Sequence, residues 1–578
     1  MIVEMCRKLY IFILIFALAI ALRVYQLDKV SPALFGDEVD VGYQAYSILK
    51  TGKDLYGRFL PVYIKSLSEY RAPLYIYSTV PFVGIFGLNE WGVRLPAVFW
   101  GVAGVIGLYL LLNQLFNSRI ATFGALILGF SPWHIHYSRA SFEVTMLLAF
   151  LIFATYFFVL FFEEKQSRAF AFLIISAALF GLTLYIYSTA ILFTPLLIIL
   201  LVVIHKNSFL RYKKIFLTFS LALFLVTLPM IWSMYSGEAR GRFSVINIFQ
   251  ESVLLNKINL ARSGQEFFTP EGEVKQTDPK WEFIFHNKPA IFAQVFTLNY
   301  LRAFSFDFLF AEGDPNFRHS IHEMGLLYLV ELPLVIFGLW ALIKTTAKKT
   351  LYIIIGWLLI APIPAALTFD GGFHATRLSI MLPPLVTLSA LGLYKLLTQS
   401  NVFFRPLKIT VIVLALVGVI FYLHRYFVHY PVESWRWWHV GFKEAINFIK
   451  DEQHSYKTVI INNSYEPSLE RYLFFTQYDP SLFHQQFVLD QHIRNILPGV
   501  DGFRLGEKLY FGKINDEARK LGGFEYIMKP NMLYMASSRD ELIINEVSNY
   551  KFGNFKIVKS IFDPSGEPIF YILSGKND

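Results

Sequence analysis

The sequence has few charged residues and almost no cysteine. Only 16% of its 578 residues are charged, whereas 55% are hydrophobic and 17% are aromatic. Cys6 is the single cysteine, which excludes an intramolecular disulfide and a cysteine-based metal site. The chain also lacks internal repeats, low-complexity tracts and glycine-rich phosphate-binding loops, so no familiar ATP-binding loop is present. This composition is not that of a soluble protein.

Long apolar runs recur along most of the chain, and each crossing of the ~30 Å hydrocarbon core needs about 20 apolar residues. We predict a polytopic α-helical membrane protein with about 11 transmembrane helices, at 9–27, 93–112, 120–136, 142–162, 169–186, 188–205, 215–233, 324–343, 350–369, 377–395 and 408–428. Segment 73–88 is short for a span and contains Pro81, so we interpret it as an interfacial or re-entrant helix. Run 9–27 lacks a small-residue cleavage site before Arg23, which favours a first helix over a signal peptide.

The formal charge of +9 comes mainly from short basic clusters beside the ends of these runs. Such clusters report membrane topology rather than nucleic-acid binding, because lysine and arginine stay on the cytoplasmic side. With eleven crossings, all the clusters fall on that side. The sequence therefore predicts a multi-pass protein of the plasma (inner) membrane, with a cytoplasmic N-terminus and an extracytoplasmic C-terminal segment.

This topology places the informative polar segments on the outer face. We divide the chain into a transmembrane domain, 1–428, and a C-terminal domain, 429–578. Within the first domain, loop 28–72 leads from the first helix and loop 234–323 is long enough to be a folded cap. Domain 429–578 has the pattern of a small α/β domain, with helices at 435–452 and 468–477, a strand at 457–465 and two strands within 555–573 around an Asp-Pro-Ser-Gly turn.

Loop 28–72 contains the densest group of acids in the first part of the chain. Asp37, Glu38 and Asp40 fall within four positions, and we interpret this segment as the catalytic loop. Asp37 and Glu38 are adjacent, so they diverge by ~100° in a helix and are not a matched pair. Transfer of a sugar needs a carboxylate that takes the proton of the acceptor hydroxyl. Acids also stabilise the first turn of a helix, here predicted at 39–49, and the loop alone favours neither role.

Other polar residues lie close to the predicted membrane surface. Turn 131–143 contains two histidines and Arg139, whose guanidinium suits a phosphate; we expect His134 to anchor at the interface beside Trp133. Spacing alone allows a metal between His319 and His322, but no third ligand is evident. Glu331 lies inside a predicted span, where a hydrogen bond to a neighbouring helix is the commoner role of an acid. Arg377 follows His374 and is placed to hold a lipid-borne phosphate.

Six segments in this order resemble the polyprenyl-phosphate-dependent glycosyltransferases of the GT-C superfamily. They are FGDEVDVGYQAYSILKTGKDLYGRFLP, SEYRAPLYIY, FGLNEWGVRLPAVFWG, HYSRASFEVT, FLFAEGDPNFRH and FHATRLSIMLPP, and they cover roughly residues 20–395. The likeness is to the family-39-like group, which includes protein O-mannosyltransferases and the aminoarabinose transferase of lipid A. It implies a GT-C-like fold and an inverting transfer of a monosaccharide from a polyprenyl phosphate to an acceptor on the outer face.

The resemblance also implies roles for particular residues. Asp37 matches the general base, with Glu38 beside it, and Glu69 matches an acid at the end of the first loop. A phosphate leaving group needs cationic contacts, for which we predict Arg139, Arg377, Arg318, His374 and Arg71. Further candidates are Glu143, where relatives often have Asp, and His319. Relatives commonly have a basic residue between the two helices of tract 169–204, whereas this chain has YIYST.

No cofactor is required by this scheme. The acids are sufficient for a divalent metal, but the resemblance does not call for one, and we assign no metal ligand. The expected partners are a polyprenyl-phosphate sugar, an acceptor that is a protein, a lipid or an envelope glycan, and membrane lipid, with no nucleic acid. A different class is a non-catalytic transporter or sensor of lipid-linked sugars, which the absence of internal repeats disfavours. Transfer of whole oligosaccharides ranks third.

Overall fold

The computed structural model describes residues 2–67, 70–163, 169–211, 213–235, 248, 258, 266–268, 274–276, 285–402, 404–487, 492–539 and 553–576. The chain forms two compact units, which are described separately. The first, here the helical unit, comprises Met1–Tyr25, Glu69–Tyr75 and Ala97–Arg425. The second, here the sheet unit, comprises Gln26–Ser68, Ile76–Pro96 and Tyr426–Asp578. The first loop therefore falls mainly in the same unit as the C-terminal segment, whereas the sequence groups it with the membrane helices.

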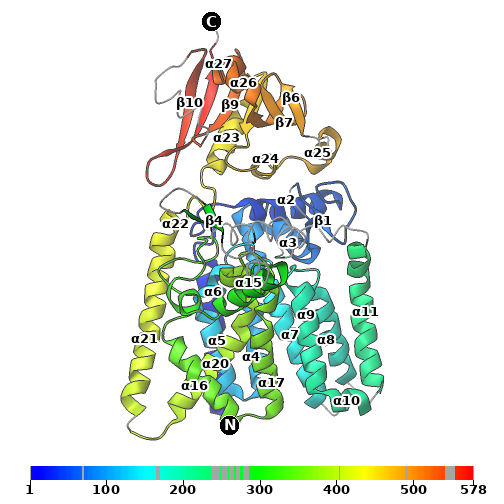
Figure 1. The fold of residues 1–578 in the computed structure, drawn as a ribbon, viewed down its shortest axis with the longest axis vertical. Coiled ribbons are helices and arrows are strands. Elements are labelled where there is room, and N and C mark those ends of the chain that lie inside the picture. The colour runs from blue at the N-terminus through cyan, green and yellow to red at the C-terminus, as the bar shows by residue number, and fades with distance from the viewer. Residues whose placement is uncertain are drawn as a thin grey trace. The chain divides into compact units, whose positions relative to one another are not determined.

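Apolar α-helices build the helical unit (Figure 1). Its described α-helices are α1 (Ile2–Val24), most of α4 (Glu90–Leu115), α5 (Ser118–Phe130), α6 (Pro132–Tyr137), α7 (Val144–Glu163), α8 (Ala169–Thr183), α9 (Ala190–Ile204), α10 (Lys206–Arg211), α11 (Lys213–Tyr235), α15 (Lys288–Arg302), α16 (Glu331–Thr345), α17 (Lys348–Ile360), α18 (Ile363–Ala366), α19 (Ala375–Leu378), α20 (Leu382–Thr398) and α21 (Phe404–His424). The predicted cap loop contributes α15, the π-helix η2 (Asp307–Ala311) and the short strands β3 (Glu266–Phe268) and β4 (Val274–Gln276). The rest of that loop lies largely outside the described residues.

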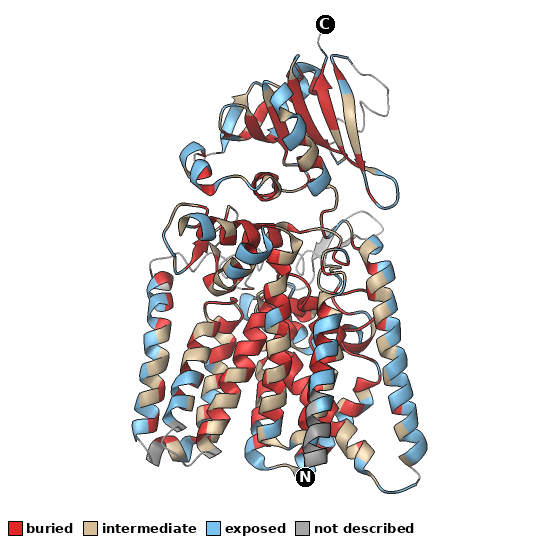
Figure 2. Ribbon diagram, turned by 180° about the vertical axis from the view of Figure 1, so that it is seen from behind, coloured by how far each residue is buried: buried red, intermediate tan, exposed pale blue. Residues whose placement is uncertain are grey.

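Six described helical segments are long and apolar enough to cross a membrane. They are Glu90–Leu115, Val144–Phe162, Lys213–Ser233, Lys348–Ala366, Ala375–Thr398 and Phe404–Glu433. Figure 2 shows that α11 and α21 are largely exposed, and such apolar exposure suits contact with lipid. The chain is therefore a multi-pass membrane protein. Five further apolar helices, including Pro73–Phe86, are shorter, and the total of eleven crossings stays a prediction.

Two predicted boundaries are wrong. The span predicted at 120–136 is divided, because α5 ends at Phe130 and Pro132 starts the separate helix α6, with the Ser131 side chain accepting from the His134 N–H. Serine before proline is a strong helix start, because proline has no N–H to leave unsatisfied. The span predicted at 324–343 begins only at Glu331. Glu331 is thus a buried first-turn residue that accepts hydrogen bonds from Tyr328 and Ser389.

The sheet unit contains the first loop and the C-terminal α/β domain. The first loop supplies α2 (Gly36–Thr51), β1 (Ile64–Lys65) and most of α3 (Pro73–Phe86). The C-terminal segment supplies η5 (Arg425–His429, a π-helix), α22 (Tyr430–Glu433), α23 (Phe442–Glu452), β5 (Thr458–Asn462), α24 (Leu469–Thr476), α25 (Pro480–Gln486), β6 (Ile493–Leu497), β7 (Val500–Leu505), β8 (Leu509–Ile514), α26 (Asp516–Lys520), α27 (Phe524–Ile527), β9 (Met532–Ser537), β10 (Phe555–Phe562) and β11 (Pro568–Gly575).

A seven-stranded sheet forms the core of this domain. Its strand order is β10-β11-β9-β5-β8-β7-β6. The central strand β5 is parallel to both neighbours, β8 and β9, while the outer pairs are antiparallel. Strand β9 is buried along its whole length, as expected where both faces are covered. The predicted α/β domain and the hairpin around Asp563 are confirmed.

The helix predicted at 435–452 is shorter than expected. It begins at Phe442, because the preceding residue, Gly441, has a φ of 99° and turns the chain. A side chain is disfavoured in that left-handed conformation. Residues 435–441 form turns instead, and two of them, Trp435 and Arg436, line a pocket of this domain.

Candidate functional site

The predicted catalytic acids lie in the first turn of α2. The helix begins after Phe35, so Gly36, Asp37 and Glu38 are its first three residues. The N-cap position belongs to Phe35, which makes no side-chain cap. Neither acid is therefore the capping residue, although both lie where the helix dipole favours a negative charge.

Glu38 forms a completely buried ion pair with Arg94 of α4. Arg94 Nε and Nη2 each donate to the carboxylate at 2.9 Å, and both side chains have 0% exposure. The remaining Arg94 protons go to the carbonyls of Leu27, Ser31 and Ala33 at 2.9, 3.0 and 2.6 Å. These five hydrogen bonds match the five N–H donors of a guanidinium. The pair fixes the first loop to the start of α4 and commits Glu38 to a structural contact.

Asp37 points away from this pair, because adjacent helical residues diverge by ~100°. Its side chain is partly exposed, unlike that of Glu38. The third acid, Asp40, is buried and accepts from Gln44, which also bonds to the backbone of Leu55 and Lys65. The turn therefore separates one partly accessible carboxylate from two buried ones.

Helix α24 of the C-terminal domain packs against α2 within the sheet unit. A Cβ atom on Gly42 would lie 2.5 Å from Phe474 and 2.7 Å from Val93, so glycine permits this close contact. Arg471 of α24 is buried, lies near Gly36, and contacts His439 Nδ1 at 2.7 Å. Burial lowers the pKa of Arg471, and the nearby carboxylates of Glu466, Glu470 and Asp37 oppose this shift. The charge of Asp37 thus interacts with a cation from the C-terminal domain.

The helical unit brings Arg71 and Glu143 together from positions far apart in sequence. Arg71 Nη1 lies 3.5 Å from Glu143 Oε1, and their exposures are 5% and 15%. Arg71 is in the short segment β2 (Tyr70–Arg71), and Glu143 directly precedes α7. Glu69 lies outside the described residues. Both described members were predicted as site residues, but their pairing was not.

Arg139 is buried and fastens α6 to the end of α1. Its Nη1 donates to the carbonyls of Leu22 and Arg23 at 2.6 and 3.0 Å. Arg23 itself contacts His134 Nδ1 at 2.7 Å, so the prediction of His134 as an interfacial anchor is wrong. Buried backbone carbonyls need donors, and the arginines supply them here. These contacts favour a structural role for Arg139 over the predicted phosphate contact.

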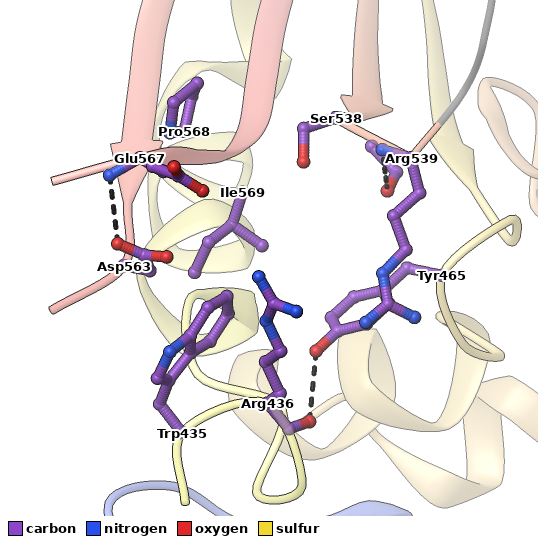
Figure 3. Close-up of a pocket in the computed structure, with 10 residues that line it drawn as sticks. Trp435, Arg436, Tyr465, Ser538, Arg539, Asp563, Glu567, Pro568 and Ile569 are labelled. Atoms are coloured by element: carbon purple, nitrogen blue, oxygen red, sulfur yellow. Dashed lines mark hydrogen bonds between the residues drawn. The ribbon is translucent and has the colours of Figure 1, made fainter. Parts of the chain in front are cut away.

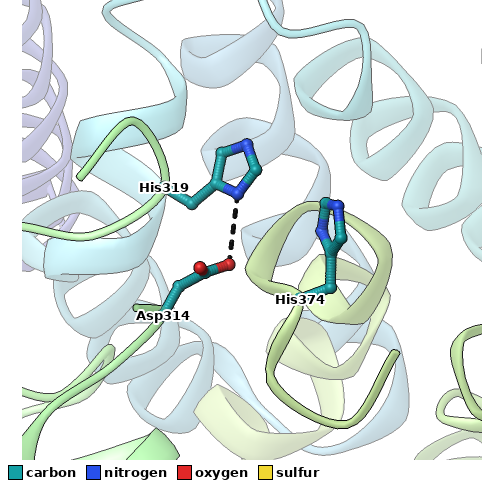
Figure 4. A group of neighbouring side chains, drawn as sticks. All are labelled: Asp314, His319 and His374. Carbon is teal, nitrogen blue, oxygen red and sulfur yellow. Dashed lines mark hydrogen bonds and ion pairs between the residues drawn. The ribbon is translucent and has the colours of Figure 1, made fainter. Parts of the chain in front are cut away.

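Asp314, His319 and His374 form a cluster that can offer three metal ligands (Figure 4). One ligand atom from each lies within 4.8 Å of the others. Asp314 Oδ2 accepts from His319 Nδ1 at 3.2 Å and from the Ala375 N–H at 2.8 Å. His322, which its spacing from His319 made a possible ligand, is not part of this cluster; it bonds to the carbonyl of Pro315 and stacks on Phe317.

Two further predicted cations approach the same segments. The Arg318 carbonyl accepts from His136 Nε2 at 2.6 Å, and the Arg318 side chain is half-buried. Arg377 pairs with Asp370 and donates to Thr368 Oγ1 at 2.7 Å. Tyr137 reaches Thr376 at 2.8 Å, which ties α6 to the chain beside Arg377. Loop 131–143 therefore meets the segments around residues 314–319 and 374–377.

Sequence reasoning missed Arg94, Asp314 and Arg471. Arg94 has a visible signal, because a charged residue within an apolar segment needs a partner. Asp314 lies inside the segment FLFAEGDPNFRH, of which only the cationic residues were considered. Arg471 has no signal in the sequence, because its contacts depend on the packing of α24.

Comparison with known proteins agrees with this description. Residues 70–232 match the family described as dolichyl-phosphate-mannose-protein mannosyltransferase. No curated protein matches the sequence. A structure of ArnT from Cupriavidus metallidurans bound to undecaprenyl phosphate is similar at 12% identity, covering 97% of each chain, with a TM-score of 0.55. The apo structure of that ArnT is similar at 12% identity, covering 98% of this chain and 97% of that one, with a TM-score of 0.52.

An oligosaccharyltransferase from Archaeoglobus fulgidus, tethered to an acceptor peptide, is similar at 10% identity. The match covers 99% of this chain and 74% of that one, with a TM-score of 0.50. At these identities the likeness shows the fold. The family model matches less than a third of the chain, and the matched structures share its fold.

Proposed function

We propose that this protein is an inverting glycosyltransferase that moves a monosaccharide from a polyprenyl-phosphate donor to an acceptor hydroxyl on the outer face of the membrane. Three findings support the proposal. The chain has the GT-C fold, residues 70–232 match a family described by its lipid-phosphate mannose donor, and a structure with the same fold binds undecaprenyl phosphate.

The observation that carries the proposal is the different environment of Glu38 and Asp37 in the first turn of α2. Arg94 holds Glu38 and thereby fixes the turn, while Asp37 stays partly exposed. A general base must be held in position and must also reach the proton that it removes. Asp37 meets both requirements, so we assign it as the base that deprotonates the acceptor hydroxyl. The hydroxyl oxygen then attacks the sugar carbon, and the bond to the phosphate breaks on the opposite side.

The donor phosphate leaves as an anion, so it needs cationic contacts rather than a proton. We propose Arg71, Arg377 and Arg318 for this task, with His374 and His319 as further donors. Arg71 and Arg377 each have a carboxylate neighbour, Glu143 and Asp370, that orients the guanidinium. Arg139 ranks behind them, because it already bonds to two backbone carbonyls.

No metal takes part in this scheme, since Asp37 supplies the base and the arginines supply the charge. We therefore expect dialysis against a chelator to leave transfer unchanged. Loss of transfer on chelation and its recovery with Zn²⁺ would assign a catalytic role to Asp314, His319 and His374. An alanine substitution at Asp314 would then abolish the recovery.

The decisive test compares the wild type with Asp37→Asn in detergent, using radiolabelled polyprenyl-phosphate monosaccharides and a membrane extract as acceptor. We expect transfer to fall by about 10²–10⁴-fold, the usual contribution of a general base. Asp451→Asn is the matched control, because Asp451 is exposed on α23. A near-normal rate in Asp37→Asn would refute the assignment. Saturable donor binding without transfer by either form would favour a transporter or sensor.

The orientation needs a separate test. Cys6 is the single cysteine, so Cys6→Ser provides a cysteine-free background. A cysteine at Lys520, which is exposed on α26, should react with an impermeant maleimide added to intact cells. Protection until the cells are lysed would place the C-terminal domain in the cytoplasm.

A further inference from the structure

A polar pocket lies within the C-terminal domain, and none of its lining residues belongs to the first loop. Its volume is about 240 Å³, and Figure 3 shows its walls. The pocket is lined by Trp435, Arg436, Tyr465, Ser537, Ser538, Arg539, Asp563, Glu567, Pro568 and Ile569. The walls come from four places: the turns before α23, the segment between β5 and α24, the end of β9, and the β10–β11 hairpin. All belong to the sheet unit.

Two guanidinium groups converge on this pocket from different segments (Figure 3). Arg436 lies over the Trp435 ring, 5.0 Å from its centroid, and Arg539 lies over the Tyr465 ring at 4.2 Å. Stacking on an aromatic ring orients an arginine while leaving its N–H edge available for a ligand. The Tyr465 hydroxyl donates to the Arg436 carbonyl at 3.1 Å, which joins the two halves.

Neither arginine forms an ion pair with a carboxylate in the part of the chain that the structure describes. Asp563 is nearby, but its Oδ1 accepts from Ser565 and from the backbone N–H of Glu567. The lining holds two arginines and two acids, so its formal charges cancel. Two oriented guanidinium groups that form no ion pair can nevertheless bind the carboxylate or the phosphate of a ligand.

The rest of the lining indicates what else the ligand has. Glu567 is exposed and Figure 3 shows its carboxylate on the pocket side, so it can accept from a hydroxyl. Ser538 adds a hydroxyl that donates or accepts. A carboxylate would repel a bare anion, but it suits a ligand in which hydroxyls accompany the anionic group. The volume is below the ~300–1,000 Å³ of pockets for drug-sized ligands, which fits one sugar ring.

We propose that this pocket binds a single sugar residue that bears a carboxylate or a phosphate. Arg436 and Arg539 hold the anionic group, and Glu567 and Ser538 hold hydroxyls. The pocket thus selects the acceptor by one anionic residue of a glycan; this last step rests on the proposed glycosyltransferase activity, whereas binding itself does not.

The test is titration of the full-length protein in detergent with glucuronate, glucose 6-phosphate, glucose and inorganic phosphate, followed by calorimetry or by ligand-observed NMR. We expect saturable binding of at least one anionic sugar and none of glucose. Arg436→Gln and Arg539→Gln should each weaken that binding by about 10-fold, because each removes a charge-assisted hydrogen bond. Arg519→Gln, which removes an exposed arginine of α26 outside the pocket, should leave it unchanged.

Three results would overturn the proposal. They are no binding of either anionic sugar, equal weakening by Arg519→Gln, and inorganic phosphate binding as tightly as the sugars, which would reduce the pocket to a simple anion site. Sugar binding by the Asp37→Asn protein, in which transfer should be lost, tests this proposal separately from the proposed function. Normal sugar binding with no transfer by the wild type would remove the enzyme but keep the pocket. Normal transfer without sugar binding would do the reverse.

Discussion

The buried Arg94–Glu38 pair should dominate the stability of the first loop. We consider Arg94→Met, which keeps an unbranched apolar stem but removes the guanidinium and all five of its N–H donors. The Glu38 carboxylate then loses both of its charge-assisted bonds at a site of 0% exposure, and the carbonyls of Leu27, Ser31 and Ala33 lose theirs. Removing one partner of a buried pair costs about 3–5 kcal/mol, so we expect a loss of at least that size.

A second substitution, Glu38→Gln, tests whether the two buried side chains are energetically coupled. In the wild-type background it removes the charge that compensates Arg94, and we expect a loss of about 1.5–3 kcal/mol. In the Arg94→Met background the same change removes an unpaired buried charge, so it should stabilise the protein. The effect of Glu38→Gln therefore reverses its sign between the two backgrounds, as coupled residues in a double-mutant cycle do.

The free energy of unfolding can be followed by tryptophan fluorescence during SDS titration in detergent micelles, since the chain has 10 tryptophans. Lys443→Met is the control, because Lys443 also pairs with an acid, Glu90 at 2.6 Å, but is 54% exposed. Exposed pairs contribute about 0–1 kcal/mol. A loss below about 1 kcal/mol in Arg94→Met, or additive effects in the double variant, would refute the assignment of the pair as the anchor of the loop.

Three further predictions follow from particular contacts. Gly42→Val should destabilise the protein by about 1–3 kcal/mol in the same titration, since its Cβ would meet Phe474 at 2.5 Å; an unchanged midpoint would contradict the packing of α2 on α24. Burial opposes the shift, but hydrogen bonds from Ser565, Glu567 and Gly566 hold the pKa of Asp563 below its ordinary value. Asp563 should therefore stabilise the hairpin above the unfolded pKa of about 3.9. The wild type should be more stable than Asp563→Ala at pH 7 and should lose this advantage as the pH falls through the lowered pKa; an equal difference between the two proteins at pH 7 and pH 2.5 would contradict it. Arg71→Lys should lower transfer by about 10-fold or more while keeping the fold, because lysine cannot supply the bidentate geometry of arginine, and Arg119→Lys should be neutral; equal rates in both variants would remove Arg71 from the phosphate site.

Composition and hydropathy predicted the class of the fold well, because a helix in lipid must be apolar over a fixed length. The C-terminal hairpin was also predictable, since Asp563-Pro564-Ser565-Gly566 has the residues of a tight turn between two alternating segments. Helix ends were predicted less well. Pro132 and Glu331 start helices inside runs that hydropathy treats as continuous, because a sliding average of hydrophobicity does not register a cap or a first turn.

Contacts between distant segments could not be predicted from a single sequence. Arg71 and Glu143 were both chosen as site residues, yet nothing local indicates that they pair across 72 positions. The Asp314, His319 and His374 cluster could not be predicted for the same reason. Helical spacing suggested His319 with His322, whereas the fold brings His319 to Asp314 and His374.

The choice between Asp37 and Glu38 shows what the fold adds to the sequence. Neighbouring carboxylates on a helix face different directions, so at most one of them can form a bidentate ion pair with a given arginine. Arg94 donates two hydrogen bonds to the Glu38 carboxylate. Moving that carboxylate to a substrate would leave a fully buried guanidinium without its counter-ion, which costs several kcal/mol. A proton acceptor that had to break such a pair in each turnover would add that cost to the barrier. Asp37 carries no such penalty from Arg94, and for this reason the first turn of α2 supports it, rather than its neighbour, as the base.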